Sequence, residues 1–209
     1  MINSAKALSK SKGKNEKRYG LSLVVDLSEN KEVKNIVSII KSKISKKIED
    51  SFVWIDEESY HITLLRCKSI SSDFIVTTES REFINDIFMN KYAFSISAST
   101  LQLDVDGVIR LYLGEIPSCF YSDVDMDELS LITGLKYKLI NIPWITIAYI
   151  KPEQIEIIAN NFKSVAQYLE REKITFQLNV DRVTLVKYSD NAFRIKKTIS
   201  NVELRDCYD

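Results

Sequence analysis

Two eight-residue stretches of this chain repeat one pattern, and they constrain its fold more than any other feature. The stretches YHITLLRC (60–67) and PWITIAYI (143–150) lie 83 positions apart and are rich in β-branched and aromatic residues, which favour strands. In a strand, alternate side chains share one face. Each stretch therefore presents a ring and a threonine hydroxyl on the same face, namely His61 with Thr63 and Trp144 with Thr146.

If the two strands are neighbours, these four side chains converge. His61 is the only histidine of the chain. An imidazole beside a hydroxyl suits proton transfer and phosphate contact, whereas an indole can stack and donate a hydrogen bond but cannot shuttle protons. The pattern therefore predicts a phosphodiester site that lacks half of its proton chemistry.

The remaining sequence predicts further strands and amphipathic helices. Alternation and β-branched residues indicate strands at Tyr19–Leu27, Phe52–Trp54, Tyr92–Leu103, Val108–Leu113, Ile174–Leu178, Val183–Tyr188 and Phe193–Ile199. The Asp106-Gly107 step between two of them is typical of a hairpin. Apolar residues spaced three and four apart indicate helices at 31–50, at 79–90, from the acidic segment after residue 122 to about Leu139, and from Pro152 onward.

Strand, helix and strand occur in the first half of the chain and again in the second. This order predicts an α+β fold with two related lobes, antiparallel or mixed sheets, and helices outside. We expect residues 1–18, which are lysine-rich and contain little to bury, to form a flexible basic tail. Residues 19–209 are then a single bilobal domain.

Composition excludes several function classes. Lys plus Arg (29) equals Asp plus Glu (29), so net charge gives no argument for a nucleic-acid or membrane partner. The nearly apolar run 139–150 is too short to span a bilayer, and the N-terminus lacks the apolar segment of a secretion signal. One histidine and three scattered cysteines offer no metal ligand set. We expect a cytoplasmic protein without metal or cofactor.

The repeated motif resembles that of the two-histidine (2H) phosphoesterases, a family that includes the bacterial RNA ligase/cyclic phosphodiesterase group. Residues 61–64 (HITL) fit the family's His-x-Thr-hydrophobic motif in full, and residues 144–147 (WITI) fit it except at the histidine. Residues 107–114 (GVIRLYLG) look like the family's lobe-bridging strand, and residues 176–189 are similar to its closing hairpin. The resemblance covers about residues 19–190 and implies the family's bilobal fold, with two antiparallel or mixed sheets around a central cleft and helices outside.

The resemblance also implies a mechanism without metal. In the family, two histidines act as general acid and base, and the two threonines hold the phosphate oxygens. His61, Thr63 and Thr146 carry over as catalytic residues, whereas Trp144 replaces the second histidine. Loss of one acid/base group typically removes about 10²- to 10⁴-fold of rate. A tryptophan can instead stack on a base, and that would turn cleavage into capture.

Three hypotheses remain open at this point. The chain recognises a nucleotide, cyclic oligonucleotide or RNA end with hydrolysis weakened or lost, with Trp144 as a substrate-binding residue. Alternatively it is an active cyclic phosphodiesterase in which His61 works with another residue, for which Tyr112, Arg110 and Lys187 are candidates that could reach a phosphate. The third is a protein-interaction module that keeps the fold without the pocket. A separate structural alternative is that His61 is a hydrogen-bonded core residue and Trp144 fills the core.

Overall fold

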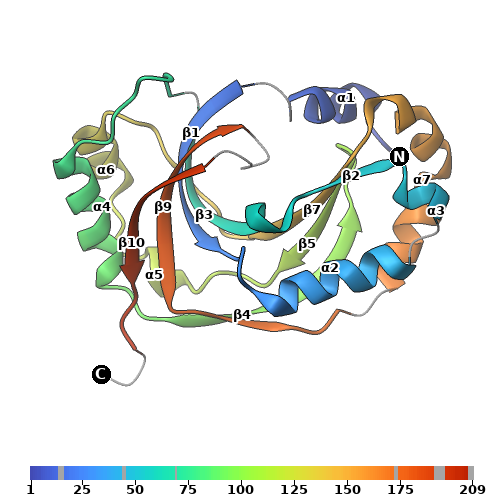
Figure 1. Ribbon diagram of the computed structural model, residues 1–209. Coiled ribbons are helices and arrows are strands. Elements are labelled where there is room, and N and C mark those ends of the chain that lie inside the picture. The colour runs from blue at the N-terminus through green and yellow to red at the C-terminus, as the bar shows by residue number, and fades with distance from the viewer. Residues whose placement is uncertain (14–16, 44–45, 69, 172–173, 191–195, 207–209) are drawn as a thin grey trace.

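The strands form one strongly curled antiparallel sheet, a half-barrel with helices around it (Figure 1). The computed structural model describes residues 1–13, 17–43, 46–68, 70–171, 174–190 and 196–206. The strand order is β10-β9-β1-β3-β7-β5-β4-β8, with β2 paired to β7 and β6 paired to β3. The strands are β1 (Lys17–Asp26), β2 (Phe52–Trp54), β3 (His61–Lys68), β4 (Phe94–Leu103), β5 (Val108–Leu113), β6 (Lys138–Leu139), β7 (Trp144–Ile150), β8 (Gln177–Val180), β9 (Arg182–Asp190) and β10 (Lys196–Glu203).

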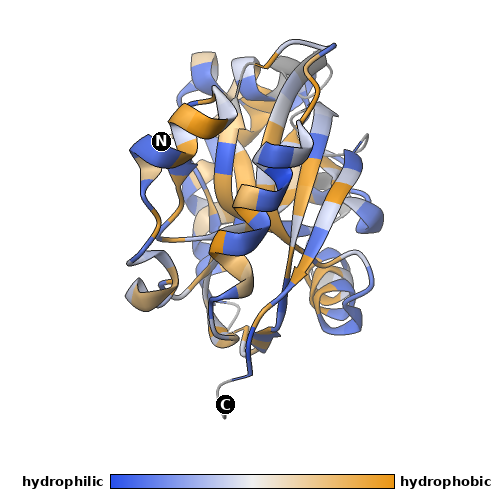
Figure 2. Cartoon of the chain, turned by 90° about the vertical axis from the view of Figure 1, so that its left-hand side faces the viewer, coloured by the Kyte–Doolittle hydropathy of each residue, from blue (hydrophilic) through white to orange (hydrophobic). Residues whose placement is uncertain are grey.

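Helices cover the outside of the sheet at both ends (Figure 1). They are α1 (Ser4–Gly13), α2 (Lys31–Lys43), α3 (Lys46–Glu49), α4 (Thr78–Met89), α5 (Ser118–Tyr121), α6 (Met126–Thr133) and α7 (Ile155–Arg171), with 3₁₀ turns η1 (Glu57–Ser59) and η2 (Pro152–Gln154). α4 packs against α6 and β10, and α7 packs against β4 and α1. The sheet between them is largely hydrophobic, while the helices carry many hydrophilic residues (Figure 2). The α+β class predicted from the sequence is therefore confirmed.

The amphipathic patterns place the core as expected. α7 buries Ile155, Ile158, Val165 and Leu169, whose three- and four-residue spacing gives one helical face. This stripe packs on the sheet because apolar surface gains free energy when it leaves water.

The N-terminal segment differs from the flexible tail expected for residues 1–18. Residues 4–13 form α1, and Ile2 and Ala7 are buried. The backbone N–H of Asn3 donates to the carbonyl of Val105, at 2.8 Å, in the β4–β5 hairpin. A Cβ at Gly107 would lie 3.0 Å from that of Ala7, so the glycine lets α1 approach this hairpin closely. α1 also packs against α7 and β7, and Ile2 and Ala7 join the main core, so this segment is part of the folded domain.

Two glycines shape turns on either side of the predicted site. Gly107 has φ 75°, and its N–H donates to the carbonyl of Asp104 at 2.9 Å, which closes the predicted hairpin. Gly134, with φ 68°, ends α6 directly after Thr133. The helix expected to continue to Leu139 therefore stops early, because the left-handed conformation of Gly134 breaks it. Residues 138–139 instead add the short strand β6 to the edge of β3.

A third glycine allows an aromatic ring to pack directly on the sheet. A Cβ on Gly20 of β1 would lie 2.2 Å from the Cζ and Oη atoms of Tyr188 on β9. Only a residue without a side chain fits beneath this ring. Tyr188, Val24 and Val186 form a small apolar cluster separate from the main core.

Candidate active site

The two repeated motifs lie side by side in the sheet. β3 and β7 are antiparallel, with Ile62 opposite Ile145. One step along this register in each direction sets His61 opposite Thr146 and Thr63 opposite Trp144. These four residues are half-buried, whereas Ile62 and Ile145 are buried on the other side. We call the side of the sheet that carries His61, Thr63, Trp144 and Thr146 the open face.

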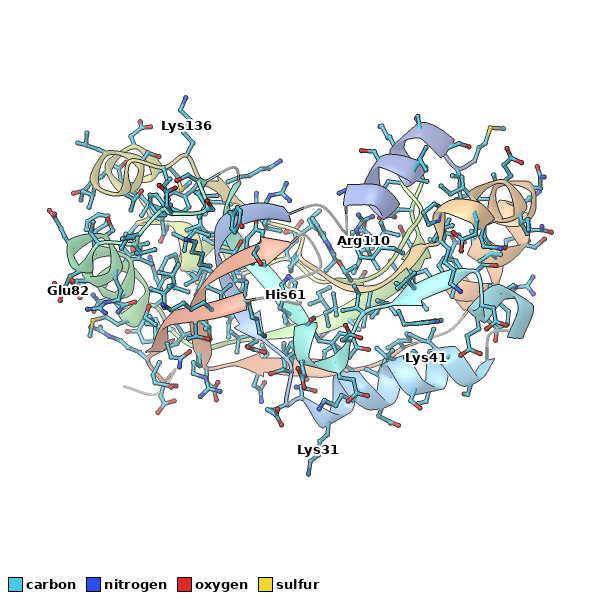
Figure 3. The ribbon with its side chains drawn as sticks, turned by 45° about the horizontal axis from the view of Figure 1, so that its top comes forward. Lys31, Lys41, His61, Glu82, Arg110 and Lys136 are labelled. Atoms are coloured by element: carbon cyan, nitrogen blue, oxygen red, sulfur yellow. The ribbon has the colours of Figure 1, made fainter. Side chains whose placement is uncertain are left out.

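His61 lies near the middle of the molecule, between the helices at its two ends (Figure 3). Its Nδ1 lies 2.7 Å from the carbonyl oxygen of Ser59, in the 3₁₀ turn before β3. Because a carbonyl can only accept, Nδ1 carries the proton, and Nε2 is the unprotonated nitrogen of the neutral ring. Burial lowers the pKa of His61 to about 4, which outweighs the hydrogen bond to Ser59. The ring is therefore neutral at pH 7.

Asp26 and Lys196 stand next to His61, and sequence reasoning did not select either. Asp26 is the cross-strand partner of His61, and its carboxylate lies 2.7 Å from the ammonium of Lys196 on β10. Burial alone would raise the pKa of Asp26, but its hydrogen bonds with Lys196 and Ser28 hold that pKa below its usual value. The two charges neutralise one another. No local pattern links residues 170 positions apart, so only the fold reveals this pair.

Arg110 and Tyr112 lie on β5 directly beside the second motif. Arg110 is opposite Thr146, and Tyr112 is opposite Trp144. The guanidinium of Arg110 forms ion pairs with Asp104 and, through two hydrogen bonds of 2.9 and 2.8 Å, with Asp106. Burial opposes the charge of Arg110, yet these carboxylates raise the pKa of Arg110 above its ordinary value. Arg110 thus lies next to the motif, but its charge is already neutralised by these carboxylates.

Tyr112 belongs to the same network. Its hydroxyl donates to a carboxylate oxygen of Asp104 at 2.7 Å. Burial, followed by this hydrogen bond, raises the pKa of Tyr112 to about 12. A phenol with this pKa is a poor proton donor at neutral pH, so Tyr112 is a poor second proton carrier beside His61.

Trp144 is held from two directions on this face. The guanidinium carbon of Arg110 lies 5.5 Å from the centroid of the indole ring, within the range of a cation–π contact. The ring of Tyr112 packs against it with centroids 6.2 Å apart and planes tilted by 56°. Trp144 nevertheless keeps part of its surface exposed. The indole therefore has two ring contacts within the site and remains partly exposed.

Lys187 does not join this group. Its ammonium donates to the carbonyls of Ser72 and Phe74, at 2.9 and 2.7 Å. Its cross-strand neighbour Leu21 belongs to the main core, so Lys187 points to the side of β9 opposite Val186 and Tyr188. The residues that the structure brings together are His61, Thr63, Thr146, Trp144, Tyr112 and Arg110.

The described residues lack two further features. They contain no group of three or more His, Cys, Asp or Glu side chains arranged to hold a metal ion. None of the helices within the described ranges is both long and apolar enough to cross a membrane.

Comparison with known proteins shows that this chain resembles a solved structure in fold. No protein-family model matches the chain, and no curated protein matches it in sequence. Among solved structures, the chain is similar to the crystal structure of TT0787 of Thermus thermophilus, with 14% sequence identity and a TM-score of 0.55. The match covers 90% of this chain and all of that chain. At this identity the likeness concerns the fold alone, and it agrees with a mixed α+β architecture built on a curled antiparallel sheet.

Proposed function

We propose that this chain has the bilobal 2H-phosphoesterase fold and binds a nucleotide or RNA-end phosphodiester on its open face, with hydrolysis weakened or lost. The observation that carries the proposal is the pairing of β3 with β7, which sets the two x-Ile-Thr motifs in adjacent antiparallel strands on one half-exposed face. Two hydroxyls, one imidazole and one indole are thus brought within reach of a single ligand.

Each side chain has a distinct role in this proposal. The hydroxyls of Thr63 and Thr146 donate to the non-bridging phosphate oxygens. His61 is neutral with Nε2 unprotonated. Nε2 can therefore act as a general base that accepts the proton of a ribose hydroxyl. Trp144 stacks on a base, an interaction worth roughly 1 to 3 kcal/mol.

Binding is favoured over cleavage because none of the other described side chains beside the two motifs is left to donate a proton: Asp26 and Lys196, next to His61, are paired with each other. Cleavage without metal needs an acid to protonate the leaving oxygen. Trp144 cannot do this, Tyr112 has a raised pKa of about 12, and Arg110 is held by Asp104 and Asp106. His61 can serve as the base, but one imidazole cannot be both the base and the acid of the same step.

Binding and turnover measurements on the same samples test the proposal. The probes are 2′,3′-cyclic nucleotides, cyclic oligonucleotides and short RNAs with cyclic-phosphate ends. We expect binding without turnover. Trp144→Ala should weaken binding about 5- to 150-fold, from the stacking energy, and Thr146→Val about tenfold or more through loss of a hydrogen bond to a charged group. Trp54→Ala, which removes the other tryptophan, is the matched control and should leave binding unchanged.

The other outcomes identify the alternatives. Turnover that His61→Ala abolishes would replace this proposal with an active cyclic phosphodiesterase. Absence of binding to every probe would leave the protein-interaction module as the better account.

A further inference from the structure

A β-bulge turns Arg66 toward the open face. Along β1 and β3, Leu23 pairs with Leu65 but Val24 pairs with Thr63, so Leu64 is an extra residue in β3. Bulges of this kind re-aim the side chains that follow them. Without the bulge Arg66 would point to the opposite side from Thr63.

The register places Arg66 one row away from Thr63. Arg66 is opposite Ser22, and Thr63 is opposite Val24, which lies two residues further along β1 on the same face. Both Leu64 and Leu65 are buried, whereas Arg66 is half-buried. At about 3.3 Å per residue, the two rows lie about 7 Å apart.

A second cation stands beside Arg66. Lys138 on β6 is the direct cross-strand partner of Arg66, and it is exposed. Like charges directly opposite one another in a sheet are destabilising. Within the described ranges, neither side chain forms an ion pair with a carboxylate. An anion between the two would relieve this repulsion.

Among the described residues, the other cations beside the two motifs already form ion pairs. Arg110 is paired with Asp104 and Asp106, and Lys196 is paired with Asp26. Among the described side chains, Arg66 and Lys138 therefore supply the unbalanced positive charge next to Thr63. Guanidinium groups bind phosphate oxygens in a bidentate manner, and lysine binds them as a point charge.

We propose that Arg66 and Lys138 form a second phosphate subsite, about one strand row from Thr63, so that the ligand is an oligonucleotide with two successive phosphates rather than a mononucleotide. This inference rests on the proposed function, because it takes the first phosphate to lie between Thr63 and Thr146. A row separation of about 7 Å is comparable to the distance between neighbouring phosphates in a single strand. The subsite holds the phosphate that flanks the recognised phosphodiester.

Dinucleotide probes test the subsite. We would measure the affinity of a diribonucleotide with one phosphodiester, and of the same dinucleotide carrying an added 5′- or 3′-phosphate, at about 0.15 M salt to limit long-range attraction. One of the two phosphorylated forms should bind about 10- to 100-fold tighter. Arg66→Gln and Lys138→Gln should each remove most of this gain while changing the affinity of the unphosphorylated dinucleotide less than about twofold.

Lys136→Gln is the matched control. Lys136 is an exposed lysine two residues before Lys138, and its side chain points outward, far from His61 (Figure 3). The Lys136→Gln variant should retain the full gain in affinity from the added phosphate. Because Lys138 is exposed, its replacement leaves the fold intact even if that of half-buried Arg66 does not.

The possible failures are distinct. If the unphosphorylated dinucleotide binds but neither added phosphate increases affinity, the subsite is refuted and the proposed function stands. The same holds if Lys138→Gln and a folded Arg66→Gln keep the full gain. If no dinucleotide binds the wild-type protein, the proposed function fails and the subsite fails with it.

Discussion

The titration of His61 is the sharpest quantitative consequence of the site. Burial lowers the pKa of His61 from 6.5 to about 4. Between these two pH values the unfolded chain binds a proton that the folded protein does not, so the free energy of unfolding falls as the pH falls from 6.5 to 4. At 1.36 kcal/mol per pKa unit, the loss through this one side chain is about 3 kcal/mol. Above pH 6.5 the contribution is constant.

The single histidine makes this measurement direct. Its ring protons give the only imidazole signals of the chain, so a proton NMR titration of the folded protein reports the pKa without assignment. Urea unfolding at pH 7 and at pH 4 gives the matching free energies. His61→Asn is the reference, because its side-chain amide can still donate to the carbonyl of Ser59 while it no longer titrates. Subtracting the reference removes the contribution of carboxylates that titrate over the same range.

A ring midpoint between pH 6 and 7 would refute the reasoning. It would mean that water solvates the ring, and His61 could then act as a general acid at neutral pH. With a pKa of about 4, only about one ring in a thousand is protonated at pH 7. The proposed preference for binding over cleavage therefore depends on the same measurement.

Two further predictions concern single substitutions. Gly20→Ala should lower the free energy of unfolding by about 1 to 3 kcal/mol, because its Cβ would lie 2.2 Å from the ring of Tyr188. Gly114→Ala, whose Cβ would lie 3.8 Å from its nearest atom, should change the free energy of unfolding by less than about 0.5 kcal/mol. Equal losses for the two variants in urea unfolding would contradict this account. Trp144→His should raise hydrolysis of a 2′,3′-cyclic nucleotide by about 10²-fold or more by adding a second proton carrier. Trp54→His should have no such effect, and a folded Trp144→His variant with unchanged turnover would show that the position does not face the reacting phosphate.

The alternation of residues predicted which motif side chains share a face, because a strand keeps its period of two wherever one side is buried. Over residues 61–63 of β3 and 144–147 of β7 the half-exposed residues and the buried isoleucines alternate as the sequence indicates. Alternation fails for Lys187, because residues 183–186 of β9 are all buried. A strand covered on both faces carries no periodic pattern that would tell where Lys187 points.

Other features depend on contacts that no local pattern encodes. Residues 1–13 are placed by the packing of α1 on α7 and β7 and by the contacts of Asn3 with Val105 and of Ala7 with Gly107, which are distant in the sequence. The pairing of Asp26 with Lys196 likewise needs the β9–β10 hairpin to be in place. By contrast, the bulge has a local trace, since the adjacent apolar residues Leu64 and Leu65 interrupt the alternation of β3.

The distribution of charge on the open face suggests how a ligand would be oriented. Around Trp144, Arg110 faces two carboxylates, and the ammonium of Lys10 lies 4.0 Å from Asp106; these charges balance. Around Arg66, one row beyond Thr63, positive charge is in excess. In the proposed binding mode, a phosphate would be drawn toward Arg66, while the uncharged base would stack on the indole of Trp144. Because the two ends of the open face would favour different parts of a nucleotide, the ligand should bind in one direction along the sheet. Reversing the charge at Arg66 should therefore weaken binding without altering the stacking on Trp144.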